Sequence, residues 1–273
     1  GFEHSFPSFP IPGTVAKRWY LAANGSLTDA RPTSKGVNWY SSDANALPLT
    51  NFGSETGGGG LWGNASQWSW KWKPNPAGTA VSYLTAPLTS DATVIGAGSV
   101  TLWVKSSTPD VDLQATVSEV TPDGHETFVQ NGYLRASERK LATGSHTVFA
   151  KPSSTLEPVP SMLAADARPM PKNQFVKVVI PLYYEGHAYR AGTRIRITIA
   201  APNGAQPVWS FGQTQPAGTT SRVSVAFSPG MPSSLVLPVA FGVSVPTPQP
   251  ACPSLRNEPC RTYVPFVNRT SAG

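Results

Sequence analysis

Charged side chains are scarce in this sequence, since only 13% of its 273 residues are Asp, Glu, Lys or Arg. Long, charge-patterned surface helices are therefore not expected. The 21 Lys and Arg residues, against 15 Asp and Glu, are scattered along the chain rather than clustered. Because a phosphate-binding surface needs several cations on one continuous face, we expect no nucleic-acid partner.

A long hydrophobic run is also missing. The most apolar window, SSLVLPVAFGVSV at residues 233–245, is interrupted by Pro238. It is shorter than the roughly 20 residues that cross a bilayer as a helix. The sequence therefore predicts no membrane span.

Recognisable catalytic and metal-binding motifs are lacking. The nucleophile motif G-x-S-x-G is absent: GSETG at 53–57 and GAGSV at 96–100 each fail at one position, and neither lies between a buried strand and a helix. The histidines are isolated and lack metal-ligand spacing, so each is predicted to be a surface side chain. They are His4, His125, His146 and His187. We therefore expect no catalytic residue, no metal and no cofactor, and an isolated chain that is inactive.

Cysteine is limited to Cys252 and Cys260, which lie eight positions apart in a Pro-rich tail. Without His or Cys companions the pair cannot complete a tetrahedral zinc site, so a disulfide that closes a small loop is the favoured interpretation. A disulfide implies an oxidising compartment. We therefore expect a secreted, periplasmic or cell-surface protein.

The chain is rich in turn-forming residues, with 28 prolines and 24 glycines, and from residue 81 onward apolar and polar residues alternate. This alternation predicts half-buried β-strands. It assigns Arg194, Arg196, Gln114 and Ser118 to outward faces. The residues expected to face inward are Leu102, Val104, Leu113, Ala115, Val117, Val176, Val178, Ile180, Leu182, Ile195, Ile197 and Ile199.

About eight such strands, separated by turns such as Asp123-Gly124, predict an all-β protein folded as a β-sandwich of the jelly-roll, galactose-binding-domain-like type. We expect residues 1–80 to wrap the sandwich and contribute strands, residues 81–240 to form its core, and residues 241–273 to form a tail. The Pro-rich stretch 151–172 has no periodicity, and it is predicted to be an irregular arm that crosses between the two sheets.

Asp110 and Asp112 are the most suggestive carboxylate pair. Their spacing places both on one face of a strand, where they could bind a cation or serve acid/base catalysis. A structural role, in which they accept backbone N–H bonds in the loop STPDVD, is the favoured interpretation.

Tryptophans form the most distinctive cluster. Trp68, Trp70 and Trp72 share one face if this stretch is a strand, and Trp62 is near in sequence. Such a row could stack on sugar rings, and it could equally be core. Lys71 and Lys73 would occupy the opposite, solvent-exposed face, so burial of the rings is favoured over a carbohydrate-binding platform.

Taken in order, several blocks resemble the C-terminal jelly-roll domain of the cocaine esterase and X-prolyl dipeptidyl-peptidase family of serine hydrolases and acylases. The blocks are RWYLAANGSL, VSYLTAPLTSDATVIGAGSVTLWVKSSTPDVDLQATVSEVTPDGHETFVQNGYLRAS, VKVVIPLYYEGHAYRAGTRIRITIAAPNGAQPVW and PSSLVLPV. The resemblance covers roughly residues 5–240.

The resemblance implies that the catalytic Ser, Asp and His belong to an α/β-hydrolase domain that precedes the jelly roll. No residue here matches the nucleophile, so no catalytic residue carries over. The chain is then an excised domain, a cleaved subunit or a stand-alone relative. We expect it to pack on an α/β-hydrolase catalytic domain and shape its cleft, with a stand-alone carbohydrate-binding module as the alternative.

Overall fold

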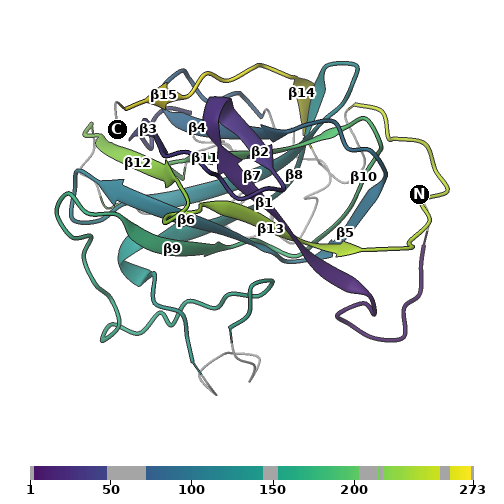
Figure 1. Cartoon of the computed structure of the whole chain (residues 1–273), viewed down its shortest axis with the longest axis horizontal. Coiled ribbons are helices and arrows are strands. Elements are labelled where there is room, and N and C mark those ends of the chain that lie inside the picture. The colour runs from purple at the N-terminus through teal and green to yellow at the C-terminus, as the bar shows by residue number, and fades with distance from the viewer. Residues whose placement is uncertain are drawn as a thin grey trace, which may run out of the picture.

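The computed structural model describes residues 3–47, 72–143, 153–202, 214, 218–252 and 259–271. Within these ranges the fold is all-β, with fifteen strands that pair almost entirely antiparallel. The helical pieces described are single turns of 3-10 helix, Ala23–Gly25 and Ala136–Glu138. Figure 1 shows the strands stacked in two layers, which is the arrangement of a jelly-roll β-sandwich.

The first layer has the strand order β14-β8-β7-β11-β4. Its strands are β14 (Cys260–Thr262), β8 (His125–Arg135), β7 (Asp112–Val120), β11 (Arg194–Ala200) and β4 (Ala80–Thr85). The register places Ile197 between Val117 of β7 and Tyr83 of β4. β11 is therefore a central strand, with a neighbour on each edge.

The second layer contains the order β1-β13-β6-β12-β3-β15. These strands are β1 (Thr14–Ala22), β13 (Ser234–Ala240), β6 (Ser99–Ser106), β12 (Ser221–Phe227), β3 (Gly36–Ser42) and β15 (Arg269–Thr270). Three more strands extend it: β9 (Val176–Pro181) pairs with β6, β5 (Ala92–Gly96) pairs with β13, and β10 (Glu185–Tyr189) pairs with β5. The short β2 (Ser26–Thr28) pairs with β1 and, in parallel, with β4, which links the layers.

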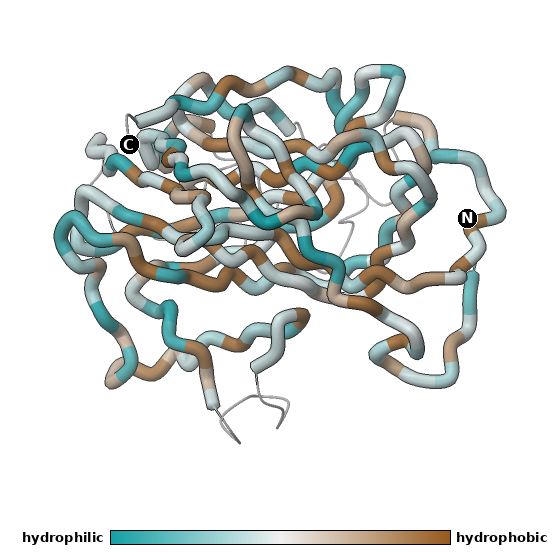
Figure 2. The backbone as a smooth tube through the Cα atoms, viewed as in Figure 1, coloured by the Kyte–Doolittle hydropathy of each residue, from teal (hydrophilic) through white to brown (hydrophobic). Residues whose placement is uncertain are grey.

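One hydrophobic core fills the space between the layers. It contains the inward-facing residues of both, such as Ile197 of β11, Val178 of β9 and Leu102 of β6, each with no exposed surface. In Figure 2 hydrophobic segments follow the strands through the interior, while hydrophilic segments concentrate at the turns. Alternation therefore identified the buried face correctly: of the twelve residues assigned to it, all but the half-buried Val176 are buried.

The opposite face of the first layer differs from the expectation. Arg196, Ser118 and Gln114 were predicted to face solvent, but they are 4%, 1% and 4% exposed. β7 and β11 are central strands, and residues 259–271 pass along the layer on its outer side (Figure 1). Period-two alternation distinguishes the two faces of a strand, but it does not reveal that a distant segment covers the second face.

Segments outside the predicted core also supply strands. β1 to β3 lie before residue 80, and β14 and β15 lie after residue 240. The boundaries at 80 and 240 themselves stay a prediction. Among the described residues, no helix has the length and apolarity that crossing a membrane would require.

The Pro-rich arm connects β8 of the first layer to β9 of the second, as predicted. From 153 to 175 it contains no strand, and it hangs below the sandwich in Figure 1. Backbone hydrogen bonds hold its two ends against the sandwich: Gly98 donates to Leu156, and Met170 donates to Pro109. The arm is thus fixed to the lower edge of the second layer.

The register of β9 can be tested with two neighbouring substitutions. Val178→Asp should destabilise the fold by more than about 4 kcal/mol, because it places an unpaired carboxylate in the core. Lys177→Asp, on the exposed face one position earlier, should change the free energy of unfolding by less than about 1 kcal/mol. Urea titration followed by Trp fluorescence measures both, and equal losses would show that the assigned faces are wrong.

Candidate functional site

The tryptophan row is only partly within the described residues. Trp62, Trp68 and Trp70 lie outside them, whereas Trp72 precedes β4 in a non-strand segment and is half-buried. The Arg261 guanidinium lies 3.5 Å from the centre of the Trp72 ring, and Phe128 packs against that ring in a T-shaped contact at 5.8 Å. Protein groups therefore occupy part of the surroundings of this ring.

Beneath Trp72, a buried ion network lies on the outer face of the first layer. Glu126 of β8 has no exposed surface, and its Oε2 atom accepts hydrogen bonds from Arg196 Nη1 at 3.0 Å and from Arg261 Nε at 2.9 Å. Its Oε1 atom accepts a hydrogen bond from the Ser118 hydroxyl at 2.7 Å. One carboxylate therefore pairs with two guanidinium groups, which come from β11 and from the C-terminal segment.

The environment of Arg261 shows how strongly this network depends on pairing. Burial lowers the pKa of its guanidinium, while the charge of Glu126 acts in the opposite direction. Arg196 adds a further cation nearby, and the Nε atom of Arg196 donates to the Ser82 hydroxyl at 2.6 Å. Removing the shared carboxylate would leave two buried cations without a counter-charge.

The C-terminal strap, which we define as residues 259–271, covers this network. At one edge of the layer, β14 pairs with β8, with Cys260 opposite Thr127. At the other edge, the Asn268 side chain accepts a hydrogen bond from the Ser82 backbone N–H and donates one to the Ser82 carbonyl, both at 2.8 Å. The strap therefore spans the layer from β8 to β4.

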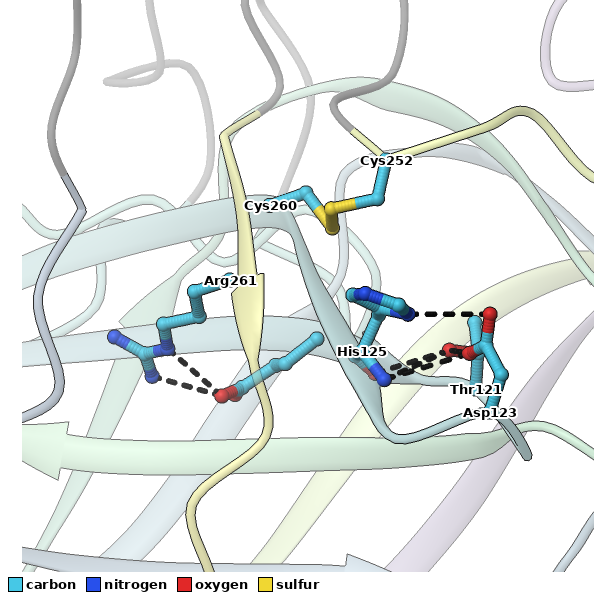
Figure 3. The surroundings of a disulfide bond; sticks show 7 residues. Thr121, Asp123, His125, Cys252, Cys260 and Arg261 are labelled. Atoms are coloured by element: carbon cyan, nitrogen blue, oxygen red, sulfur yellow. Dashed lines mark hydrogen bonds and ion pairs between the residues drawn. A yellow bond between two sulfur atoms is a disulfide. The ribbon is translucent and has the colours of Figure 1, made fainter.

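A disulfide anchors the start of this strap. Cys252 and Cys260 are bonded to each other, as the sequence predicts. Figure 3 shows that Cys260 is the neighbour of Arg261 on β14, so the bond lies directly beside the ion network. The bond thus closes a loop of the tail directly before the strap.

Two histidines form carboxylate pairs that superficially resemble part of a catalytic triad. His187 Nε2 lies 2.8 Å from Glu119 Oε2, and His125 Nδ1 lies 3.1 Å from Asp123 Oδ2, as Figure 3 shows for the second pair. Among the described residues, no Ser hydroxyl hydrogen-bonds either imidazole. A nucleophile next to the base, which acyl transfer requires, is therefore not part of either pair.

The predicted surface position was right for two histidines and wrong for one. His4 is exposed, and the His125 side chain is 43% exposed. His187 was expected at the surface, but its side chain is only 12% exposed and pairs with the buried Glu119. The pairing of β10 with β5 brings it there, which the local sequence could not indicate. His146 lies outside the described residues.

The carboxylates Asp110 and Asp112 have structural roles. Asp110 Oδ1 accepts hydrogen bonds from the backbone N–H groups of Val111 and Ser137, both at 2.9 Å. Asp112 Oδ1 accepts a hydrogen bond from Arg135 at 2.8 Å, in a cross-strand ion pair. In the described part of the chain, no group of three or more His, Cys, Asp or Glu side chains is arranged to hold a metal.

We expect Glu126→Gln to destabilise the fold by about 3–5 kcal/mol, because it keeps the shape of the side chain but leaves two buried guanidiniums unneutralised. Asp29→Asn is the matched control: Asp29 pairs with Lys17 at 3.0 Å with its side chain 67% exposed. Its loss should cost less than about 1 kcal/mol. Chemical denaturation of both variants gives the comparison, and similar losses would contradict the network.

Comparison with known proteins places this geometry in context. Two mycobacterial proteins named, provisionally, as serine esterases, from Mycobacterium bovis and Mycobacterium tuberculosis, are each 26% identical over 199 residues. That alignment covers 72% of this chain and 30% of each relative, so the chain spans about a third of their length.

Solved structures share the fold. A CocE/NonD family hydrolase from Staphylococcus aureus has a TM-score of 0.62 at 19% identity, covering 87% of this chain and 38% of that one. An alpha-amino acid ester hydrolase has a TM-score of 0.59 at 20% identity, covering 82% and 36%. An aminopeptidase from a marine sediment archaeon, a Thaumarchaeota archaeon, has a TM-score of 0.61 at 16% identity, covering 87% and 38%.

The family comparison also covers most of the chain. Residues 2–235 match the family described as the X-Pro dipeptidyl-peptidase C-terminal non-catalytic domain, which includes nearly all of the two-layer sandwich and stops before the strap. The sequence resemblance to this family is thereby confirmed. The chain belongs to the family of X-Pro dipeptidyl-peptidase C-terminal non-catalytic domains.

Proposed function

We propose that this chain serves a serine hydrolase that cleaves amide or ester bonds, as the non-catalytic domain that packs on its α/β-hydrolase catalytic domain and walls one side of the active-site cleft. The observation that carries the proposal is the family match over residues 2–235, in a sequence that lacks the G-x-S-x-G motif. The relatives are about three times longer than the matched segment, which leaves room for a catalytic domain.

The contacts of the described residues support a non-catalytic role for this chain. The histidine–carboxylate pairs contain no nucleophile, and the carboxylates Asp110 and Asp112 hold backbone and arginine groups. A stand-alone carbohydrate-binding module, the alternative raised by the tryptophans, has less support because Arg261 and Phe128 pack on Trp72.

The proposal predicts where a serine-directed probe reacts. A fluorophosphonate should leave the isolated chain unlabelled, whereas it should label the complete protein translated from the gene that encodes residues 1–273 at one serine before residue 1. Substituting that serine with alanine should abolish both labelling and hydrolysis of proline-containing dipeptide amides or aryl esters. Stoichiometric labelling of a serine within residues 1–273, with loss of turnover in its alanine variant, would contradict a non-catalytic role.

We further propose that the protein works in an oxidising compartment, that is, secreted, periplasmic or at the cell surface. The support is the Cys252–Cys260 bond, which uses both cysteines of the sequence. In the protein purified from its source, unfolded without reductant and treated with iodoacetamide, Cys252 and Cys260 should stay unalkylated, and after reduction both should be alkylated, as peptide mass spectrometry would show. Alkylation before reduction would show free thiols and argue for a reducing compartment.

A further inference from the structure

Several large apolar side chains are exposed on the described surface. They are Phe6, Phe9, Val15, Met162, Leu163, Tyr183, Tyr184, Phe241, Val264 and Val267. Singly exposed apolar residues are common on soluble proteins, but contiguous exposed groups mark interaction sites. The informative question is therefore which of these side chains touch one another.

Two aromatic contacts bring together three separate segments of the chain, and they are joined through the consecutive residues Tyr183 and Tyr184. Phe9, before β1, has its ring centre 5.9 Å from that of Tyr184, and Tyr183 has its ring centre 6.0 Å from that of Tyr133 on β8. Phe9, Tyr183 and Tyr184 are 53%, 50% and 54% exposed. We call these four residues the aromatic surface.

The backbone beneath the aromatic surface is held in place. Tyr183 donates its N–H to the Asn131 carbonyl of β8 at 2.8 Å, and Leu182 donates to Gly98 at 3.1 Å. Gly132 permits this close approach, since a Cβ there would lie 1.9 Å from the Pro181 carbonyl oxygen. The rings of Tyr183 and Tyr184 are therefore presented from a backbone segment that is held in place, which lowers the entropy lost when a partner binds.

A cavity of about 290 Å³ opens beside Phe9. Its walls are mostly apolar, and they come from the segment before β1, from β5, β13 and the arm; they include Pro10, Ile95, Leu156 and Pro238. Glu157 lies at this cavity and accepts a hydrogen bond from the Tyr184 hydroxyl at 2.8 Å. Aromatic side chains beside an apolar recess with a polar rim are typical of the centre of a protein–protein interface.

The position of the aromatic surface points to one occupant, the catalytic domain. This inference rests on the proposed function, in which a catalytic domain precedes residue 1. Phe9 lies eight positions after residue 1, a span of at most about 28 Å when extended, so any preceding domain is tethered within that reach of Phe9. His4 binds the Ser244 carbonyl at 2.7 Å, which holds the entering segment against the domain.

On the outer side of the first layer, the strap of residues 259–271 covers the ion network, and a second cavity of about 440 Å³ lies beside Tyr263 of the strap. We propose that the aromatic surface, with its adjoining cavity, is the face on which the preceding α/β-hydrolase domain docks. In this arrangement the cavity receives an apolar side chain of the hydrolase domain, and the rings of Tyr183 and Tyr184 pack against the surface of that domain.

Hydroxyl-radical footprinting tests the proposal by comparing the isolated chain with the complete protein translated from its gene. Oxidation of Phe9, Tyr183 and Tyr184 should fall about fivefold in the complete protein, because docking reduces their exposed fraction from about half to about a tenth. Tyr263 of the strap is the internal control, and its oxidation rate should not change. The isolated chain is measured at two concentrations, because protection that increases with concentration would indicate contact with a second copy.

Each other outcome overturns the proposal in a distinguishable way. Protection of Tyr263 with unchanged oxidation of Tyr184 would place the hydrolase domain on the strap side and leave the proposed function intact. Protection of Tyr184 in the isolated chain that increases with concentration would assign the surface to a second copy. A gene that encodes no hydrolase domain would end both proposals.

A pair of variants provides an independent readout in the complete protein. Phe9→Asp combined with Tyr184→Asp should uncouple the two domains and separate one thermal unfolding transition into two. Val267→Asp, at an 87% exposed position of the strap, should leave the single transition unchanged. In the isolated chain both variants should keep a cooperative unfolding transition, because each substituted side chain is more than half exposed. A single transition in both variants would contradict the docking face.

Discussion

The carboxylate of Glu126 is the interaction on which the covering of the first layer depends. It lies without solvent contact between the guanidiniums of Arg196 and Arg261, one on a central strand and one on the C-terminal strap. A buried cation is costly unless a counter-charge lies within hydrogen-bond reach. The strap therefore does more than cover the sheet, because it also supplies Arg261, one of the two cations that pair with Glu126.

This arrangement gives the sandwich two different sides. On the outer face of the first layer, the ion network is covered by the strap, by the hydrogen bonds of Asn268 to Ser82 and by Trp72 over Arg261. The lower edge of the second layer carries the arm and the exposed rings of Phe9 and Tyr184. A domain that approaches from the N-terminal side thus meets an aromatic surface, whereas the chain's own C-terminus covers the ion network of the first layer.

Prediction from the sequence succeeded where a local repeat carries the information. The alternation around Ile197 and Val178 reports which side of each strand is apolar, and burial of that side is the main source of stability. It failed at Arg196, Ser118 and His187, whose burial depends on segments far away in the chain. The cysteine pair was predictable because both residues lie in one short segment, whereas Glu126 and Arg261 are separated by 135 positions.

By itself, the sequence determined the all-β class, the inward faces of the strands, the disulfide and the family, because these follow from short-range periodicity, spacing and ordered blocks of residues. Only the tertiary structure decided which outward faces are covered, which carboxylate neutralises which guanidinium, and where the exposed rings gather. Strand pairing and the path of the strap bring together residues such as Phe9 and Tyr184, which lie 175 positions apart. Such contacts depend on the register and packing of the whole sandwich, and no local pattern encodes them.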